Sequence, residues 1–366
     1  MGKRELLIIL AFVVLGAAAY QLTAPPDTNR PRRFSLSNVL SNMRREIRGN
    51  PASATVTVTG SAPAKGLTEL RVANAQFMAI TGEAREDIAW EMVVESNGPD
   101  EATAEALAKR TILKQDDLGS ALGLRVTYPP EARQTARLTL KVPASLAVRI
   151  DGPRFTSEVH ANHLAAIQLD AIGDVTIENV TGAVTGTHRT GDLKVTDAQS
   201  VGLTLVSSSA ELRGVRGTMT INARNGSTSI EQASGNVEID ENNNEVKLTG
   251  VAGTTRVVGT GGTVTIENPR GEVKVDVRRS EVEIAIDKPI AVTALTTDEP
   301  LRLLVDDESG VMVDALASDG GTIQGKDFSL APEQHDQETR VIHTFGGTTR
   351  VSLRNQRGEI VLRRRK

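Results

Sequence analysis

A glycine that recurs every nine residues restricts what the middle of this chain can fold into. The period begins at Gly173 and runs to Ser280, with one apparent single-residue deletion near residues 200–208. Nine of the thirteen repeat starts are glycine. These are Gly173, Gly182, Gly191, Gly217, Gly226, Gly235, Gly253, Gly262 and Gly271. Such self-similarity is typical of an array in which each repeat packs mainly on its neighbours.

Within each unit, apolar and polar side chains alternate as in a short, half-buried strand. The second residue after the start is apolar in eleven of thirteen units, and the fourth in all but one, where Gly186 stands. The residue between them is polar or charged everywhere except at Gly202. Each unit therefore predicts a strand with one buried side, followed by a glycine turn.

The units are of two kinds. A Val, Ala or Pro stands two residues before every second start, at intervals of 18, 17, 18, 18 and 18 residues. These residues are Val180, Ala198, Val215, Ala233, Val251 and Pro269. Two units therefore make one coil, and the sequence predicts an all-β fold, a parallel β-solenoid with two sheets and about 18 residues per coil. Parallel crossovers are overwhelmingly right-handed, so we expect that hand.

The rest of the chain divides by composition and periodicity. The expected segments are a signal anchor or signal peptide at 1–24, a tether at 25–52, an N-terminal β-rich region at 53–150, the solenoid repeats at 151–288, and a C-terminal β region and cap at 289–366.

Two further features lie outside the central repeats. Pro99 and an acidic first turn predict one short helix near 100–117. Alternation returns at 349–362, which resembles one more coil before the basic tail. Because an exposed end of a solenoid invites edge-to-edge growth, we assign capping to the charged termini and the helix-bearing N-terminal region.

The N-terminus predicts a single membrane segment. Lys3 and Arg4 precede an apolar run over 6–24, which fits a retained anchor or a cleaved signal peptide. Its membrane-facing residues are expected to include Leu6, Ile9, Phe12, Val13, Leu15 and Tyr20. Three arginines within 30–33 outnumber the two basic residues before the run, and by the positive-inside rule they favour a cytoplasmic C-terminal domain.

Composition argues against several functions. A net charge of −4 leaves no basic footprint for nucleic acid, so no nucleic-acid partner is expected. The chain has no cysteine, which excludes thiolate metal sites and Cys nucleophiles. The turn at 260–264 places Thr and Val where a calcium-binding β-roll needs Gly and Asp. The sequence predicts no cofactor, no metal and no catalytic residue.

The solvent-facing side of the strands is the candidate working surface. Its acids and bases are interleaved, which suits a solvated sheet or a polar platform for a cell-wall glycan or an envelope protein. The candidate contact residues are Thr220, Glu238, Lys247, Arg256, Thr265 and Lys274. The alternative is a polysaccharide-acting β-helix enzyme using Glu238 with Asp240, or Glu281 with Glu283, although the repeats lack aromatic residues for stacking on sugars.

Three stretches resemble a bacterial family of β-strand repeats that bears the name "putative adhesin" and is a domain of unknown function. They are Gly-Asp-Val-x-Ile-x-x-Val-x-Gly at 173–182, the apolar run at 138–148, and Asn-x-x-Gly-Glu-Ile-x-Leu near the end. The resemblance covers about residues 54–366. It implies the fold and an envelope location, and adhesion only as the name of the family. Together with the residue patterns, we expect a non-catalytic bacterial envelope protein, membrane-anchored or exported with the solenoid outside the cytoplasmic membrane, that has an adhesin-like or scaffolding role. A cytoplasmic-facing polymerising scaffold is the remaining alternative.

Overall fold

The computed structural model describes residues 52–130, 134–152 and 157–365. Within these ranges the chain is nearly all β, with one helix and strands that belong to a single large sheet. The predicted membrane segment lies outside the described residues. Within the described part of the chain, no helix has the length and apolar character needed to cross a membrane.

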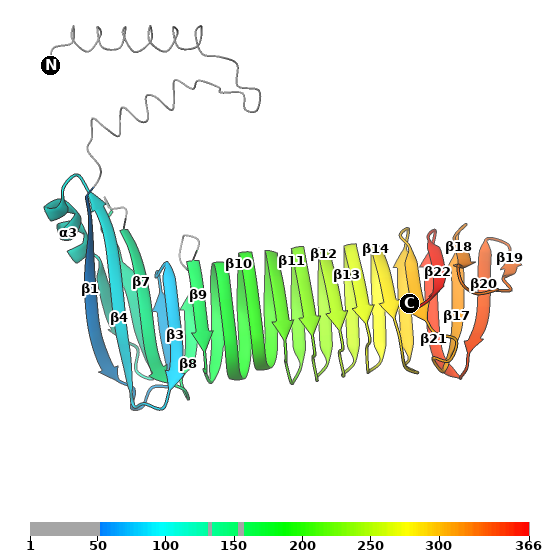
Figure 1. The fold of residues 1–366 in the computed structure, drawn as a ribbon, viewed down its shortest axis with the longest axis horizontal. Coiled ribbons are helices and arrows are strands. Elements are labelled where there is room, and N and C mark those ends of the chain that lie inside the picture. The colour runs from blue at the N-terminus through cyan, green and yellow to red at the C-terminus, as the bar shows by residue number, and fades with distance from the viewer. Residues whose placement is uncertain (1–51, 131–133, 153–156, 366) are drawn as a thin grey trace, which may run out of the picture. The chain divides into compact units, whose positions relative to one another are not determined.

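The centre of the molecule is a row of parallel strands (Figure 1). They are β10 (Ala166–Arg213), β11 (Met219–Glu231), β12 (Val237–Thr249), β13 (Thr255–Glu267) and β14 (Val273–Ala285). From β11 to β14 each residue pairs with the one 18 positions later, as Thr220 does with Glu238 and Glu238 with Arg256. The parallel pairing and the 18-residue step agree with the sequence pattern.

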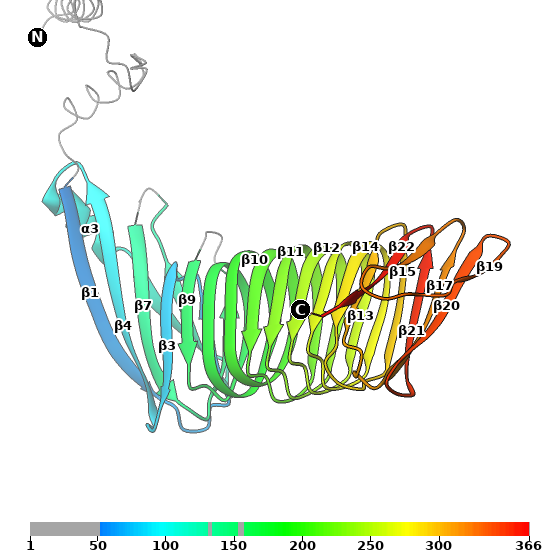
Figure 2. The ribbon, with the colours of Figure 1, turned by 45° about the vertical axis from the view of Figure 1, so that its right-hand side comes forward.

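Each of these long strands bends and contributes to two layers, which Figure 2 shows as arches joining the near and far strands. Layer 1 continues β9 (Ser157–Asn162) through the later halves of β11 to β14, and layer 2 continues β8 (Ala147–Asp151) through the earlier halves. Aliphatic side chains from both halves, such as Ile239 and Leu248, are fully buried in one common core. This burial provides the main driving force for stacking.

The repeat glycines stand where successive coils approach most closely. A Cβ added to Gly235 would lie 2.2 Å from the carbonyl oxygen of Gly217, one coil earlier. Positive φ occurs at some repeat glycines, such as Gly191 with φ of 114°, and also at residues just before unit starts, including Asn225, Asn243 and Arg279, with φ of 54°, 53° and 50°. The chain bends at Gly217, Gly235, Gly253 and Gly271, as the glycine-turn pattern predicts, and at Gly235 the close stacking of coils excludes a side chain.

The N-terminal strands continue both layers but change direction. They are β1 (Ala52–Pro63), β2 (Glu69–Ala73), β3 (Phe77–Glu83), β4 (Asp87–Gly98), β5 (Ile112–Asp117), β6 (Ala121–Thr127) and β7 (Gln134–Pro143). Layer 1 runs outward from β9 through β3, β7 and β4 to β1, and layer 2 from β8 through β2 and β6 to β5. The outermost pairs, β4–β1 and β6–β5, are antiparallel, so the parallel pattern does not extend to this end.

The helix is shorter than predicted. Helix α3 spans Glu101–Lys109, and the Asp100 carboxylate caps it by accepting a hydrogen bond from the Thr103 amide at 2.7 Å. Residues expected to extend the helix to 117 form β5 instead. The apolar spacing around Ile112 and Leu113 is compatible with either a helix or a strand. The antiparallel pairing with β6 stabilises the strand.

The C-terminal strands do not stack in chain order. They are β15 (Val292–Thr297), β16 (Leu301–Val305), β17 (Val311–Ser318), β18 (Thr322–Gly325), β19 (Glu333–His335), β20 (Glu338–Phe345), β21 (Thr349–Gln356) and β22 (Glu359–Arg364). The coil expected at 349–362 is present as β21 and β22, but it inserts between the β15–β16 pair and the β17–β18 pair. The basic tail therefore does not cap the stack. That role falls to β18 and to the β19–β20 hairpin, which pairs antiparallel with β17.

Candidate functional site

The six predicted contact residues lie on two opposite outer faces. Four form one column on layer 2, at register positions that pair directly: Thr220, Glu238, Arg256 and Lys274. The other two, Lys247 and Thr265, pair with each other on layer 1. Five of the six are exposed and Thr265 is half-buried. Consecutive units belong to opposite layers. Residues at the same position of successive units therefore lie alternately on the two outer faces, and the predicted set mixes both.

The charged members of this set already have partners of opposite charge. Arg256 Nε lies 3.4 Å from Glu238 Oε1, Lys274 Nζ lies 2.9 Å from Glu272 Oε2, and Lys247 Nζ lies 3.5 Å from Glu267 Oε1. Exposed pairs of this kind contribute little to stability. They do neutralise the surface locally, which leaves less net charge to attract a ligand.

In the enzyme alternative, the candidate carboxylates are Glu238 with Asp240 and Glu281 with Glu283. Glu238 is ion-paired with Arg256, and Glu281 with Arg302. One carboxylate of each pair is therefore already matched by an arginine.

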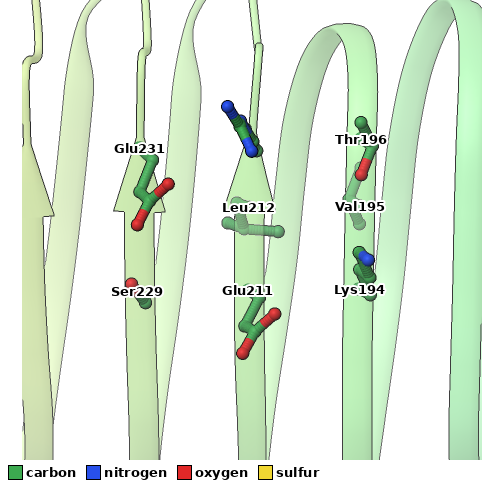
Figure 3. Close-up of a pocket in the computed structure, with 8 residues that line it drawn as sticks. Lys194, Val195, Thr196, Glu211, Leu212, Ser229 and Glu231 are labelled. Carbon is green, nitrogen blue, oxygen red and sulfur yellow. The ribbon is translucent and has the colours of Figure 1, made fainter.

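A shallow groove crosses the outer face of layer 1. Its first part has a volume of about 200 Å³ and is lined by Lys194, Glu211, Ser229 and Glu231, among others. Figure 3 shows these side chains on neighbouring strands. Glu211 pairs with Ser229 and Ser229 with Lys247, so a short side chain lies between two long ones. Within the hollow itself, the short Ser229 side chain lies beside the longer side chains of Glu211 and Glu231.

A second part, about 320 Å³, adjoins the first and shares Lys194 and Glu211 with it. Asp174, Thr176 and Asp192 also line it. The Asp192 amide donates a hydrogen bond to Asp174 Oδ1 at 3.2 Å, which orients that carboxylate. Among the described residues, no group of opposite charge lies within ion-pairing distance of Lys194 or Glu211. The groove thus presents an ammonium and a carboxylate to solvent on adjacent strands.

Another hollow, of about 340 Å³, lies farther along layer 1 and is lined by Thr265, Glu283 and residues 363–365 of the tail. Arg365 donates to Asn268, and Arg364 Nη2 donates to Asp307 Oδ2 at 2.6 Å. The sequence pattern does not predict this hollow, because its arginines come from a coil inserted out of chain order. Nor does the sequence pattern predict the groove at Lys194, because its lining residues form no motif.

The titratable groups with the deepest burial face the interior. His188 is fully buried, with Nδ1 2.5 Å from Ser208 Oγ and Nε2 2.7 Å from the Gly173 carbonyl, and burial lowers its pKa. Glu241 is 1% exposed, and burial raises its pKa. Neither residue lines the grooves described above. In the described part of the chain, no three His, Cys, Asp or Glu residues are grouped so as to hold a metal ion.

No family model matches this chain, and no curated protein matches it. Two solved bacterial structures show a weak likeness. A "putative cell adhesion protein" from Clostridium sporogenes is 9% identical, with 86% of this chain and 100% of that one covered, at a TM-score of 0.19. A "putative adhesin" from Bacteroides fragilis is 10% identical, with 85% and 97% covered, at a TM-score of 0.26. Similarity this low establishes neither a shared function nor a shared ligand.

Proposed function

We propose that this chain is a non-catalytic protein of the bacterial cell envelope, with an adhesin-like or scaffolding role, that binds its partner through the outer face of layer 1. In this proposal the coils form a right-handed, two-sheet β-solenoid, and the N-terminal apolar segment anchors the chain or directs its export. The parallel pairing at an 18-residue step supports the solenoid. A continuous stack of polar strands suits recognition of an extended partner.

The observation that carries the proposal is a group of unpaired charges in the groove, of which Lys194 and Glu211 lie on adjacent strands. Lys194 is available to a carboxylate of the partner, and Glu211 to an ammonium group. On layer 2, by contrast, the corresponding charges of Glu238, Arg256 and Lys274 are matched within the protein. A cell-wall glycan that carries both amino and carboxyl groups fits the groove best, since each of its charges would meet an opposite one.

Co-sedimentation of the detergent-solubilised full chain with insoluble bacterial cell-wall sacculi tests the proposal. Replacing Lys194 and Glu211 together by glutamine should reduce the bound fraction about tenfold, because two charge-assisted contacts are lost. Added salt should weaken binding of the native chain, since the groove is solvent-exposed.

The matched control replaces Glu238 and Lys274 by glutamine, which removes the same two charges from layer 2 and should leave binding intact. Equal binding by both double variants, or no binding by the native chain, would refute the proposed surface. Protease accessibility of the C-terminal tail in spheroplasts, compared with lysed cells, separately tests the envelope location.

A further inference from the structure

Strand β1 has a nearly palindromic sequence. Residues 51–63 read Pro-Ala-Ser-Ala-Thr-Val-Thr-Val-Thr-Gly-Ser-Ala-Pro, with Thr57 at the centre. Five of the six mirrored pairs are identical, and the sixth matches Ala54 with Gly60. The mirrored positions therefore carry side chains of the same or nearly the same size.

This strand is also the outer edge of layer 1. All twelve residues of β1 pair antiparallel with β4 on one side, and no other described strand pairs with β1. None of the twelve carries a charge. The corresponding edge of layer 2, β5, is half as long and includes Lys114, Asp116 and Asp117. Edge strands are usually protected by charge or by short length, and β1 has neither protection.

Helix α3 covers a face of this end of layer 1 rather than the edge of β1. The helix contacts both β1 and β4. Gln134 of β7, one strand farther in, donates a hydrogen bond from Nε2 to the Leu107 carbonyl at 2.9 Å. A helix that reaches three adjacent strands must lie across them, so the backbone groups on the outer side of β1 remain accessible.

We propose that β1 pairs with β1 of a second copy of this chain, antiparallel and about a twofold axis at Thr57. Residues whose numbers add to 114 then lie opposite each other, so Val56 faces Val58 and Thr55 faces Thr59. Cross-strand Val–Val and Thr–Thr pairs stabilise antiparallel sheets. Layer 1 of the two copies becomes one continuous sheet.

Two observations favour a second copy as the occupant. A residue on a twofold axis faces its own copy, so a charge near Thr57 would meet a like charge, and β1 has none. Val58 is 38% exposed although its partner Met92 is fully buried, and pairing with Val56 of the second copy would cover it. Both valines lie on the same side of the strand.

The chain segment that precedes β1 is a poorer candidate. Residues 25–51 include four prolines, and the proline-free run at 32–50 places its apolar residues at helical rather than alternating spacing. A strand needs free amide groups and a two-residue alternation to complete this edge. The second copy supplies both.

Disulfide cross-linking of the full chain tests the register, because the native chain has no cysteine. Thr57→Cys should form a disulfide-linked dimer under mild oxidation, since directly opposed residues have Cα atoms about 4.5–5.5 Å apart. Thr55→Cys alone should not, because its two copies lie four residues apart, about 13 Å. A mixture of Thr55→Cys and Thr59→Cys chains should cross-link.

A dimer held only by the N-terminal segment would not select this register, so equal cross-linking of Thr55→Cys and Thr57→Cys overturns the proposal. A Thr57→Cys chain that stays monomeric overturns the proposal as well. That result is expected if residues 25–51 occupy the edge of β1. The test leaves the groove of layer 1 untouched, so its outcome is independent of the proposed function.

A second variant measures the affinity. Thr57→Asp should weaken dimerisation about fivefold or more in sedimentation equilibrium, because two like charges meet at the axis. Thr57→Asn has nearly the same shape without the charge and should dimerise as the native chain does. Identical dimerisation of the Asp and Asn variants would contradict pairing at this position.

Discussion

Glu241 is a buried carboxyl that accepts two hydrogen bonds. The Asn244 amide donates to Oε2 at 3.3 Å, and Ser280 Oγ donates to Oε1 at 3.2 Å. Ser280 lies two coils away, and the intervening coil has Gly259 opposite Glu241, where a Cβ would lie 2.8 Å from Glu241 Cγ. The side chain can therefore span a coil only because the neighbour has no side chain.

We expect Glu241→Gln to change how stability depends on pH. Burial raises the pKa of the folded-state carboxyl, so the folded chain holds this proton more tightly than the unfolded chain does. Ionisation therefore costs stability as pH rises from the ordinary range of a carboxyl through the raised pKa. The Gln variant should have the same Tm as the native chain at about pH 4, and a Tm a few degrees higher at about pH 8. A Tm difference that is the same at both pH values would contradict this.

Among the C-terminal strands, Asp314 forms ion pairs that join the last strands of the stack. It lies on β17 with a side chain that is 5% exposed. Arg340 of β20 donates to it at 3.1 Å, and Arg350 and Arg354 of β21 each donate at 3.1 Å. One carboxylate thus joins β17 to the strands on both of its sides.

Burial acts to raise the pKa of Asp314, but hydrogen bonds from Arg340 and Arg354 outweigh it and lower the pKa to about 2. The stabilising contribution of its charge is therefore present above the ordinary pKa of an aspartate and is lost as pH falls toward the lowered value.

Asp314→Asn should destabilise the C-terminal end by about 1–3 kcal/mol, because three arginines lose a shared anion. Hydrogen exchange should accelerate in β20 while the central strands β11 to β13 keep their protection. Asp298→Asn is the matched control, since its pair with Arg357 is more exposed and should contribute little to stability. Unchanged exchange in β20 would mean that apolar packing alone holds this end.

At the scale of the whole molecule, the coils are interchangeable modules that contact mainly their neighbours. Strands β11 to β14 pair with one another in chain order, at the same 18-residue step. Stability in such an array is approximately a sum of unit and interface contributions.

Deleting one full coil, residues 235–252, should leave a folded chain with its register intact. The new junction places Gly253 after Ser234 and lets Thr255 pair where Val237 did, so each layer keeps its own strands. Deleting only residues 235–243 removes one unit and should disrupt the fold, because every later unit is then assigned to the wrong layer. Circular dichroism and thermal unfolding compare the two. Equal tolerance of both deletions would contradict the two-layer coil.

Strand alternation, the 18-residue step and parallel pairing of the central region follow from the sequence alone. An aliphatic residue at the second and fourth positions of a unit can be buried only if the strand keeps one face inward, so local pattern is sufficient there. The candidate site was predicted less well. All six expected residues lie at the surface, yet they divide between two faces, and the groove at Lys194 and Glu211 was not among the expectations.

Only the tertiary structure decided the order of the last coils, the length of helix α3 and which strand is left as an edge. Parallel strands are joined by backbone hydrogen bonds, and these bonds are the same for every coil. The aliphatic pattern therefore does not specify which coil stacks on which, so it cannot predict that β21 and β22 insert before β17 and β18. The groove also depends on how the coils stack. Whether Lys194 forms an ion pair is determined by the side chains of the neighbouring coils rather than by its own unit. Periodicity determines that a residue points outward, and the stacking of distant segments determines what it meets there.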